Sequence, residues 1–190
     1  MNVAFCIYDG ITVLDFVGAY DAVTRLERMD FMPLEWDVCA PTERVNADRL
    51  DLGVDRVEPD LGAYDLVFLP GGYATRELQD DRAFLEWLET AEGCEYLISV
   101  CTGSLLLGAA GFLDGKRATT HPNAFGDLAA YAEVVDERVV EDGNVITGRG
   151  VSSSIDLGLY VVETLSDADT RKTIAEQMDY PYGKAVFSDE

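Results

Sequence analysis

A cysteine between an apolar run and a helix-forming run constrains this chain more than any other feature. Residues 96–98 are apolar, residues 99–104 are mostly small, and residues 105–110 favour a helix. This order predicts a strand, a tight turn and a helix. Cys101 stands in the turn, so we expect it on a strained strand-to-helix bend, the geometry that presents a serine nucleophile in hydrolases.

Cys101 has a functional and a structural interpretation at this position. The following helix would point its positive N-terminus at the sulfur, which favours thiolate over thiol and suits a nucleophile. A free cysteine also packs well as a small buried hydrophobe. The other three cysteines, Cys6, Cys39 and Cys94, lie within or beside predicted strands, and we interpret them as buried thiols.

The strand and helix patterns predict an α/β fold. Apolar runs alternate with amphipathic ones, which is typical of a mostly parallel sheet covered by helices on both faces. We therefore predict a three-layer α/β sandwich forming one domain over residues 1–190. The predicted strands are 2–8, 34–40, 66–70 and 95–100, and the predicted helices between and after them are 14–29, 81–91 and 102–110.

Smaller elements complete the prediction. Residues 43–58 favour a small hairpin or an edge excursion, and Asp142-Gly143 predicts the turn of a second hairpin over 137–147. Ser152 to Ser154 are expected to cap a helix that ends near residue 165, and Asp167 to cap a last one over 168–177. A polar tail, expected to be loosely held, begins at Pro181.

Two further stretches suggest partners for Cys101. The strand at 66–70 ends in a glycine pair, and the backbone N–H of Gly72 could form a two-donor oxyanion hole with that of Thr102. Ligands of such sheets bind at the carboxyl ends of the strands, where Gly72 and Cys101 are both expected. Asp15 is flanked by apolar residues, an unfavourable setting for a carboxylate without a partner or a task.

The sequence resembles the DJ-1/PfpI superfamily, and most closely its isocyanide hydratase branch. The matching stretches are LDFVG at 14–18, LPGG at 69–72, SVCTGSLLLGAAGFLDGKRATTHP at 99–122 and ERVVEDGNVITGRGVSSSIDLGL at 137–159. The resemblance implies a flavodoxin-like fold, also that of class I glutamine amidotransferases, and a homodimer. It further implies that Cys101 is the catalytic or redox-active residue and that Asp15 hydrogen-bonds its sulfur.

The sequence also departs from the family pattern. Thr102 follows the cysteine where the branch described as proteases has histidine, so peptidase activity is poorly supported. Asp15 replaces the glutamate of DJ-1-like members. Ala19 and Pro122 stand where the hydratase branch tends to have proline and tryptophan, so the pocket shape is expected to differ.

His121, the single histidine of the chain, keeps two interpretations. It could orient or deprotonate Cys101, or it could be a hydrogen-bonded structural residue before a helix that starts at Pro122. Three acidic residues, Asp21, Glu77 and Asp156, are expected to be solvated or to cap helices.

The leading functional hypothesis is a cysteine-dependent hydratase or hydrolase of a small electrophile, with an isocyanide converted to an N-substituted formamide. The alternatives are a redox sensor in which Cys101 is oxidised, a glyoxalase-like or deglycase-like enzyme, and a ligand-sensing module. The sequence has no CxxC motif, GxGxxG fingerprint or phosphate loop, so we expect neither a metal nor a cofactor.

The charge balance excludes other classes of partner. The chain has 36 acidic residues against 14 lysines and arginines, a net charge of −22. Nucleic acids and anionic membranes need a cationic face, so neither is expected. Scattered acidic residues and scarce lysine favour a halophilic cytoplasm, where salt screens the repulsion. No apolar run approaches the ~18 residues of a membrane span and no signal peptide is evident, so we expect a cytoplasmic protein.

Overall fold

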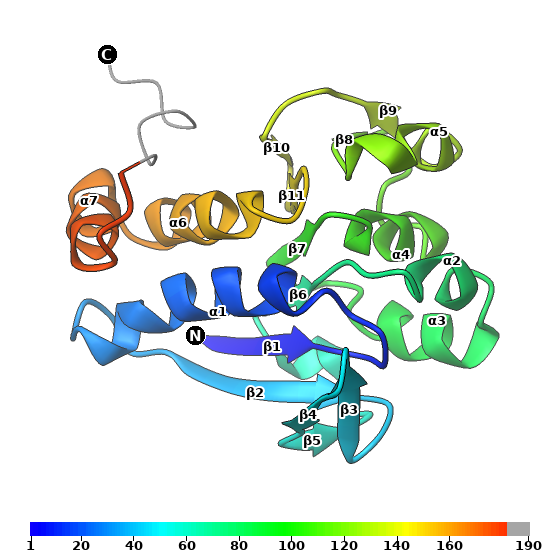
Figure 1. Ribbon diagram of the computed structural model, residues 1–190, viewed down its shortest axis with the longest axis horizontal. Helices are drawn as coiled ribbons and strands as arrows, with labels where there is room; N and C mark the ends of the chain where they lie inside the picture. Colours follow the sequence, from blue (N-terminus) through cyan, green and yellow to red (C-terminus); the bar gives the residue numbers. More distant parts are fainter. Residues whose placement is uncertain (182–190) are drawn as a thin grey trace.

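A seven-stranded sheet forms the centre of the computed structural model, which describes residues 1–181 (Figure 1). Its strand order is β10-β11-β7-β6-β1-β2-β5. Neighbouring strands are parallel, except that β10 and β11 form an antiparallel hairpin. The strands are β1 (Asn2–Cys6), β2 (Glu35–Ala40), β5 (Arg56–Val57), β6 (Leu66–Leu69), β7 (Tyr96–Val100), β10 (Val139–Asp142) and β11 (Val145–Gly148). The predicted mostly parallel sheet is confirmed.

The helices form two groups on the sheet. The first group, α1, α6 and α7, packs together, and the second runs from α2 to α5 (Figure 1). Right-handed crossovers in opposite directions from the middle of the sheet place the two groups on opposite faces. The helices are α1 (Val13–Arg28), α2 (Thr75–Leu78), α3 (Arg82–Glu89), α4 (Gly103–Ala109), α5 (Phe125–Leu128), α6 (Ser153–Leu165) and α7 (Ala168–Gln177). The three-layer sandwich is confirmed.

Four short strands lie outside the main sheet. An antiparallel hairpin joins β3 (Arg44–Ala47) to β4 (Leu50–Gly53), and β8 (Arg117–Ala118) pairs in parallel with β9 (Glu133–Val134). Over residues 43–58 the chain therefore forms both expected alternatives, a hairpin and then the edge strand β5. Two 3₁₀ turns, at Leu61–Ala63 and Pro122–Ala124, complete the described elements.

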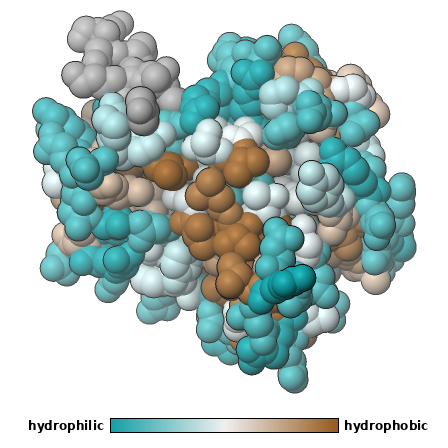
Figure 2. Space-filling model, in the orientation of Figure 1, coloured by the Kyte–Doolittle hydropathy of each residue, from teal (hydrophilic) through white to brown (hydrophobic). Residues whose placement is uncertain are grey.

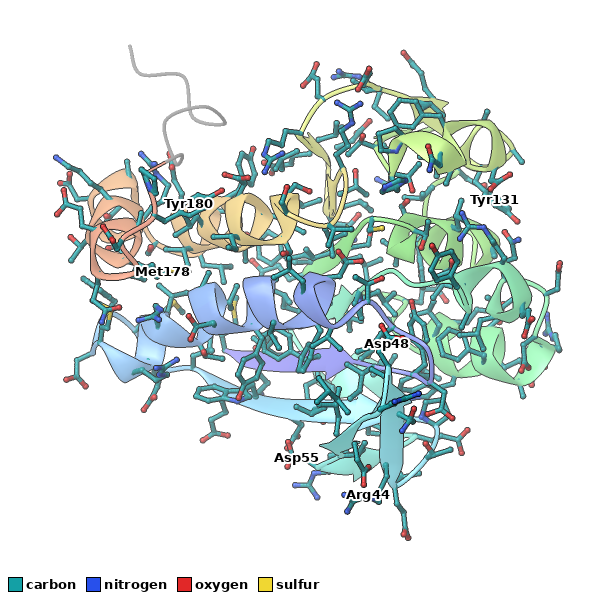
Figure 3. The ribbon with its side chains drawn as sticks, in the orientation of Figure 1. Arg44, Asp48, Asp55, Tyr131, Met178 and Tyr180 are labelled. Carbon is teal, nitrogen blue, oxygen red and sulfur yellow. The ribbon has the colours of Figure 1, made fainter. Side chains whose placement is uncertain are left out.

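The middle strands explain the apolar pattern of the sequence. Every residue of β6 is buried, and so are four of the five residues of β7. A strand with helices on both faces has no solvent side, so its residues do not alternate between apolar and polar. On the second group of helices, Tyr131 lies against α4, where a Cβ at Gly108 would come within 2.6 Å of the Tyr131 side chain (Figure 3).

Close packing of α1 on α6 holds the start of α1 in place. A Cβ on Gly18 would lie within 2.9 Å of the Ser154 Cβ, so the two helices meet where one lacks a side chain. At the same crossing, the Ser154 hydroxyl donates to the carbonyl oxygen of Leu14 at 2.9 Å. The residue after Leu14 is Asp15, so this contact positions the first turn that bears it.

Three expectations about the second half of the chain need correction or lie outside the structure. Ser152 is the N-cap residue of α6, but its side chain makes no capping hydrogen bond. The Ser153 hydroxyl accepts the Gly150 N–H. Asp156 is buried rather than solvated: it forms an ion pair with Arg138 and accepts a hydrogen bond from Tyr180. The expected tail falls, beyond Pro181, outside the described residues.

Within the described chain, no helix has the length and apolar character needed to cross a membrane.

Candidate active site

Cys101 occupies a strained bend between β7 and α4. Its φ of 55° lies in the left-handed region, which residues other than glycine rarely adopt. The backbone around it is held firmly, because its N–H donates to the Gly148 carbonyl at 2.9 Å and its own carbonyl accepts the Thr120 hydroxyl at 2.9 Å. The bend predicted from the sequence is therefore present, and both neighbouring segments fix it.

Gly71 is the point where the groups of the site converge. A Cβ on Gly71 would lie 2.6 Å from the Thr102 nitrogen, 2.7 Å from the Cys101 Cβ and 2.9 Å from an Asp15 carboxylate oxygen. Any side chain there would displace these groups from one another. The sequence predicts a role for Gly72 and not for Gly71, although both belong to the same glycine pair.

Asp15 is a fully buried carboxyl group without a conventional partner. Its exposure is 0%, and neither oxygen has a hydrogen-bond partner of normal geometry. Burial raises the pKa of Asp15 to about 6, because water no longer stabilises the charged form. The Cys101 thiol and the Gly71 N–H face the carboxyl and lower this pKa, but only in part.

Cys101 is the second member of a coupled pair. Burial, and then the nearby Asp15 charge, raises the pKa of Cys101 to about 12, although the N–H and hydroxyl of Thr102 lower it. The sequence predicts that the start of α4 favours the thiolate, whereas burial and the Asp15 charge favour the protonated thiol. Two adjacent anions are unfavourable, so the pair holds one proton over the neutral range.

Thr102 and Gly72 bind each other rather than leaving two free donors. The Gly72 N–H donates to the Thr102 hydroxyl at 3.0 Å, and that hydroxyl lies 3.0 Å from the Gly72 carbonyl oxygen, to which it donates. This corrects the expected role of Gly72, whose N–H is already engaged. The N–H of Thr102 faces the Cys101 sulfur.

Tyr8 is a second residue that the sequence analysis missed. Its buried hydroxyl donates to the Pro70 carbonyl at 2.5 Å, which anchors the loop that leads to Gly71. Burial raises the pKa of Tyr8 well above its usual value, and electrostatic interactions with Asp15 and Cys101 add to the shift. Tyr8 therefore stays neutral beside the pair. Nothing in its strand pattern distinguished it from a core aromatic residue.

His121 lies beside the strand-to-helix bend at Cys101, which we call the elbow, and is held by its own turn. Its Nδ1 accepts the Asn123 N–H at 3.2 Å, and its ring packs where a Cβ on Gly150 would be 2.9 Å away. This matches the interpretation as a hydrogen-bonded residue before Pro122. Among residues 1–181 no hydrogen bond joins His121 to Cys101, and Thr120 makes the link to the elbow instead.

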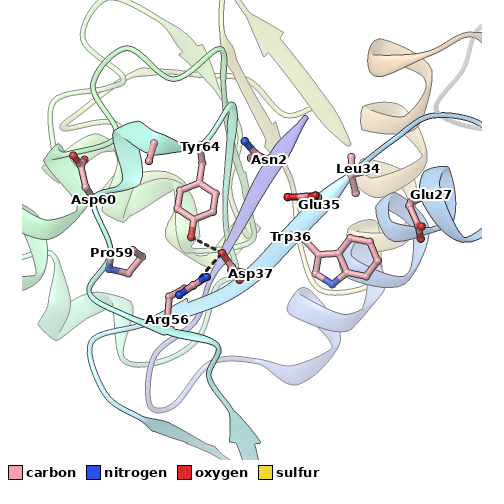
Figure 4. A pocket seen from close by; sticks show the side chains of 11 residues that line it. Asn2, Glu27, Leu34, Glu35, Trp36, Asp37, Arg56, Pro59, Asp60 and Tyr64 are labelled. Atoms are coloured by element: carbon pink, nitrogen blue, oxygen red, sulfur yellow. Dashed lines mark hydrogen bonds and ion pairs between the residues drawn. The ribbon is translucent and has the colours of Figure 1, made fainter.

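A groove along β2 does not contain the candidate catalytic groups. Figure 4 shows Trp36, Asp37 and Tyr64 along it, with Asp37 accepting the Tyr64 hydroxyl at 2.7 Å and pairing with Arg56 at 3.5 Å. The remaining charged side chains that line it are Glu27, Glu35 and Asp60. Within the described residues no cluster of three or more His, Cys, Asp or Glu is arranged to hold a metal ion.

Comparisons with known proteins agree with this architecture. The isonitrile hydratase of Pseudomonas putida is 35% identical over 183 residues, which cover 95% of this chain and 78% of that protein. The zebrafish (Danio rerio) Parkinson disease protein 7 homolog is 39% identical over 127 residues, covering 63% of this chain and 64% of that one.

A solved ThiJ/PfpI family protein from Pseudomonas syringae superposes with a TM-score of 0.85 at 30% identity, over 95% of this chain and 75% of that one. Schizosaccharomyces pombe DJ-1, at 20% identity, shares the fold with a TM-score of 0.80 over 95% of this chain and all of its own. The profile of the DJ-1/PfpI family matches residues 1–164. The chain therefore belongs to the DJ-1/PfpI family.

Proposed function

We propose that the protein is a cysteine-dependent hydratase of a small electrophile, and that the substrate is an isocyanide, which becomes an N-substituted formamide. The observation that carries this proposal is the burial of Asp15 beside Cys101. The Asp15 carboxyl is fully buried and makes no hydrogen bond of normal geometry. A buried carboxyl with a pKa of about 6 is suited to accept and return a proton at neutral pH. The similarity to isonitrile hydratase, isonitrile being another word for isocyanide, supports the substrate class.

The first half of the reaction forms a covalent intermediate. The Cys101 sulfur attacks the terminal carbon of the isocyanide while its proton passes to the Asp15 carboxylate. Asp15 then gives that proton to the same carbon, which yields a thioimidate. The Thr102 N–H faces the sulfur and stabilises negative charge that develops there. Gly72 contributes by holding the Thr102 hydroxyl.

The second half releases the product. Asp15, again a carboxylate, takes a proton from a water molecule as that water adds to the thioimidate carbon. The carbon–sulfur bond then breaks, the nitrogen is protonated, and the thiol of Cys101 is regenerated. The sum is one isocyanide and one water converted to one formamide, so no cofactor is required.

A matched set of cysteine variants tests this proposal. Cys101→Ala should abolish formation of formamide from a panel of isocyanides, whereas Cys94→Ala should retain it. Cys94 is an apt control because it is also buried, with its sulfur 3.2 Å from the Tyr64 carbonyl. Full activity in Cys101→Ala, or no turnover of any isocyanide by the native protein, would refute the assignment. Parallel assays with α-dicarbonyls test the glyoxalase-like alternative.

Redox sensing is the second candidate, because DJ-1 homologues are among the relatives. A thiol whose pKa is raised to about 12 is mostly protonated at neutral pH, and the thiolate is the form that peroxide oxidises. Attack on an isocyanide needs the same thiolate, so the raised pKa does not separate the two functions and an experiment must. Rapid peroxide-dependent addition of oxygen at Cys101, without turnover of any electrophile, would favour the sensor.

We also propose a homodimer that covers the start of α1. Leu14 and Val17 are 42% and 38% exposed, and Figure 2 shows apolar side chains gathered over this part of the face. Contiguous exposed apolar surface is typical of an interface. A monomeric mass from light scattering in molar salt would contradict it.

The acidic composition supports a salt-rich cytoplasm as the working environment.

A further inference from the structure

A cavity beside the elbow has the opposite charge character to the rest of this protein. It has a volume of about 420 Å³ and is lined by Leu14, His121, Pro122, Arg138, Arg149, Gly150, Val151 and Ser152. Two arginines and the single histidine are among these residues, and no aspartate or glutamate is. The groove along β2, by contrast, is lined by four acidic residues and one arginine. In a chain of net charge −22, a cationic lining is the exception that needs a reason.

Three residues of the cavity wall directly follow or precede residues of the Cys101 site in the chain. Leu14 directly precedes Asp15, and His121 follows Thr120, whose hydroxyl binds the Cys101 carbonyl. Arg149 follows Gly148, whose carbonyl accepts the Cys101 N–H. Three separate segments therefore connect the cavity wall to the Cys101 site.

The two guanidinium groups differ in how firmly their charge is already engaged. Arg138 forms an ion pair with the buried Asp156, which is 1% exposed and also accepts the Tyr180 hydroxyl. Arg149 pairs with Asp136 at 2.9 Å, and the side chain of Asp136 is 62% exposed. An exposed ion pair contributes little, so a ligand could replace Asp136 without leaving a buried charge behind.

The remaining groups present donors in fixed positions. The Arg149 guanidinium lies 5.7 Å from the centre of the Phe125 ring, a contact that restricts its orientation. The Nδ1 of His121 accepts the Asn123 N–H, so in the neutral ring the proton is on Nε2, which is a donor.

We propose that this cavity binds the anionic end of the substrate, and that the electrophile attacked by Cys101 has a carboxylate group. Replacing Asp136 frees one positive charge, on Arg149, which matches one carboxylate rather than a doubly charged phosphate. A guanidinium and a carboxylate form two parallel hydrogen bonds, which also orients the ligand. This inference rests on the proposed function, because it extends the same site to a substrate class.

The test uses two alkylating reagents that differ in a single group. Iodoacetamide is neutral and iodoacetate has a carboxylate, and peptide mapping reports the rate of each at Cys101. We expect the iodoacetate-to-iodoacetamide rate ratio to fall at least fivefold in Arg149→Gln. It should stay within twofold in Arg82→Gln, because Arg82 is a 74% exposed residue paired with Glu86 on α3. All rates are measured at one KCl concentration, because salt screens such interactions.

The outcomes separate the two proposals. An unchanged ratio in Arg149→Gln, or an equal fall in both variants, would overturn the carboxylate site and leave the nucleophile intact. A ratio that falls as expected in a protein that turns over neither neutral nor carboxylate-bearing isocyanides would sustain the anion site and refute the isocyanide substrate. If iodoacetamide alkylates Cys101 and iodoacetate does not react measurably even in the native protein, the carboxylate site is overturned, whereas the isocyanide assay of Cys101→Ala still decides the role of the nucleophile.

Discussion

Two aspartates of this protein are buried to the same extent, but only one of them has hydrogen-bond partners. Asp15 and Asp156 are 0% and 1% exposed, and each lies in the first turn of a long helix. Asp156 is satisfied, since Arg138 and Tyr180 bind its two oxygens. Neither oxygen of Asp15 has a partner of normal geometry. The helices that bear them, α1 and α6, pack against each other, so the two carboxyl groups differ in their local partners and not in the layer of the fold.

The difference follows from the cost of burying charge. A buried ion without partners is strongly unfavourable, so it either gains a partner or its pKa shifts. Asp156 has gained partners, which tie α6 to the β10 region and to the end of the described chain. Asp15 has no such partners and has a shifted pKa instead, and its value of about 6 keeps proton exchange accessible. An unsatisfied buried carboxyl beside a thiol therefore marks chemistry, and a satisfied one marks structure.

Removal of the Asp15 carboxyl is the change expected to affect turnover most among the aspartates. Asp15→Asn should lower kcat about 100-fold or more, the usual scale for loss of a positioned acid or base. The amide has a similar shape, but it neither accepts nor returns the proton. Steady-state kinetics with the best isocyanide substrate measure this loss, and kinetics equal to those of the native protein would remove Asp15 from the mechanism.

Asp156→Asn should show the reverse behaviour. The amide leaves the Arg138 charge uncompensated, so we expect the free energy of unfolding to fall by about 1–3 kcal/mol. Arg138 is 40% exposed, and water limits the loss to this range. Turnover of a neutral isocyanide should change by less than about fivefold, because Asp156 does not contact the Cys101 pair. Chemical denaturation gives the first quantity, and an unchanged midpoint would show that the ion pair is dispensable.

The pH dependence of turnover distinguishes the two aspartates in a third way. The active form needs the Asp15 carboxylate, so kcat/KM should fall as pH drops through about 6, to about a tenth of its plateau one unit lower. The same acid limb should persist in Asp156→Asn. A profile that stays flat from pH 8 to pH 5 would mean that no group with the raised pKa of Asp15 controls the reaction.

Salt acts on the exposed acidic residues and leaves both buried ones nearly untouched. Raising KCl from 0.1 to 2 M should raise the Tm by several degrees, because the Debye length shrinks from ~10 Å to ~3 Å or less and apolar burial is then strengthened. Lowering the pH toward 4–5 at low salt should produce part of the same gain. A Tm that stays flat across this KCl range at neutral pH would defeat the halophilic interpretation without affecting Cys101.

The sequence predicted most of the sheet and the bend at Cys101. The apolar runs of β6 and β7 are long enough to identify buried parallel strands, and the small residues around Cys101 indicate the turn. The unfavourable setting of Asp15 between apolar residues was visible for the same reason. These features are local, so neighbouring residues in the chain reveal them.

The remaining parts of the site depend on contacts between distant segments. Gly71 belongs to the site because two distant segments, one with Asp15 and one with Cys101 and Thr102, converge on its missing Cβ. Tyr8 belongs to it because its hydroxyl meets a carbonyl 62 positions away. Asp156 looked solvated because its partners, Arg138 and Tyr180, lie 18 and 24 positions away. The balance of burial against the helix terminus at Cys101 likewise depends on the packed structure.

The most direct test of this comparison is the free energy of unfolding of Asp15→Asn and Asp156→Asn, measured together at pH 7.5. The raised pKa of Asp15 means that the folded state binds its proton more tightly than the unfolded state. Stability is therefore lost as pH rises from about 4 to about 6. Asparagine removes that cost, so Asp15→Asn should be at least as stable as the native protein, by up to about 3 kcal/mol, while Asp156→Asn is less stable. A destabilised Asp15→Asn beside an unaffected Asp156→Asn would contradict the account.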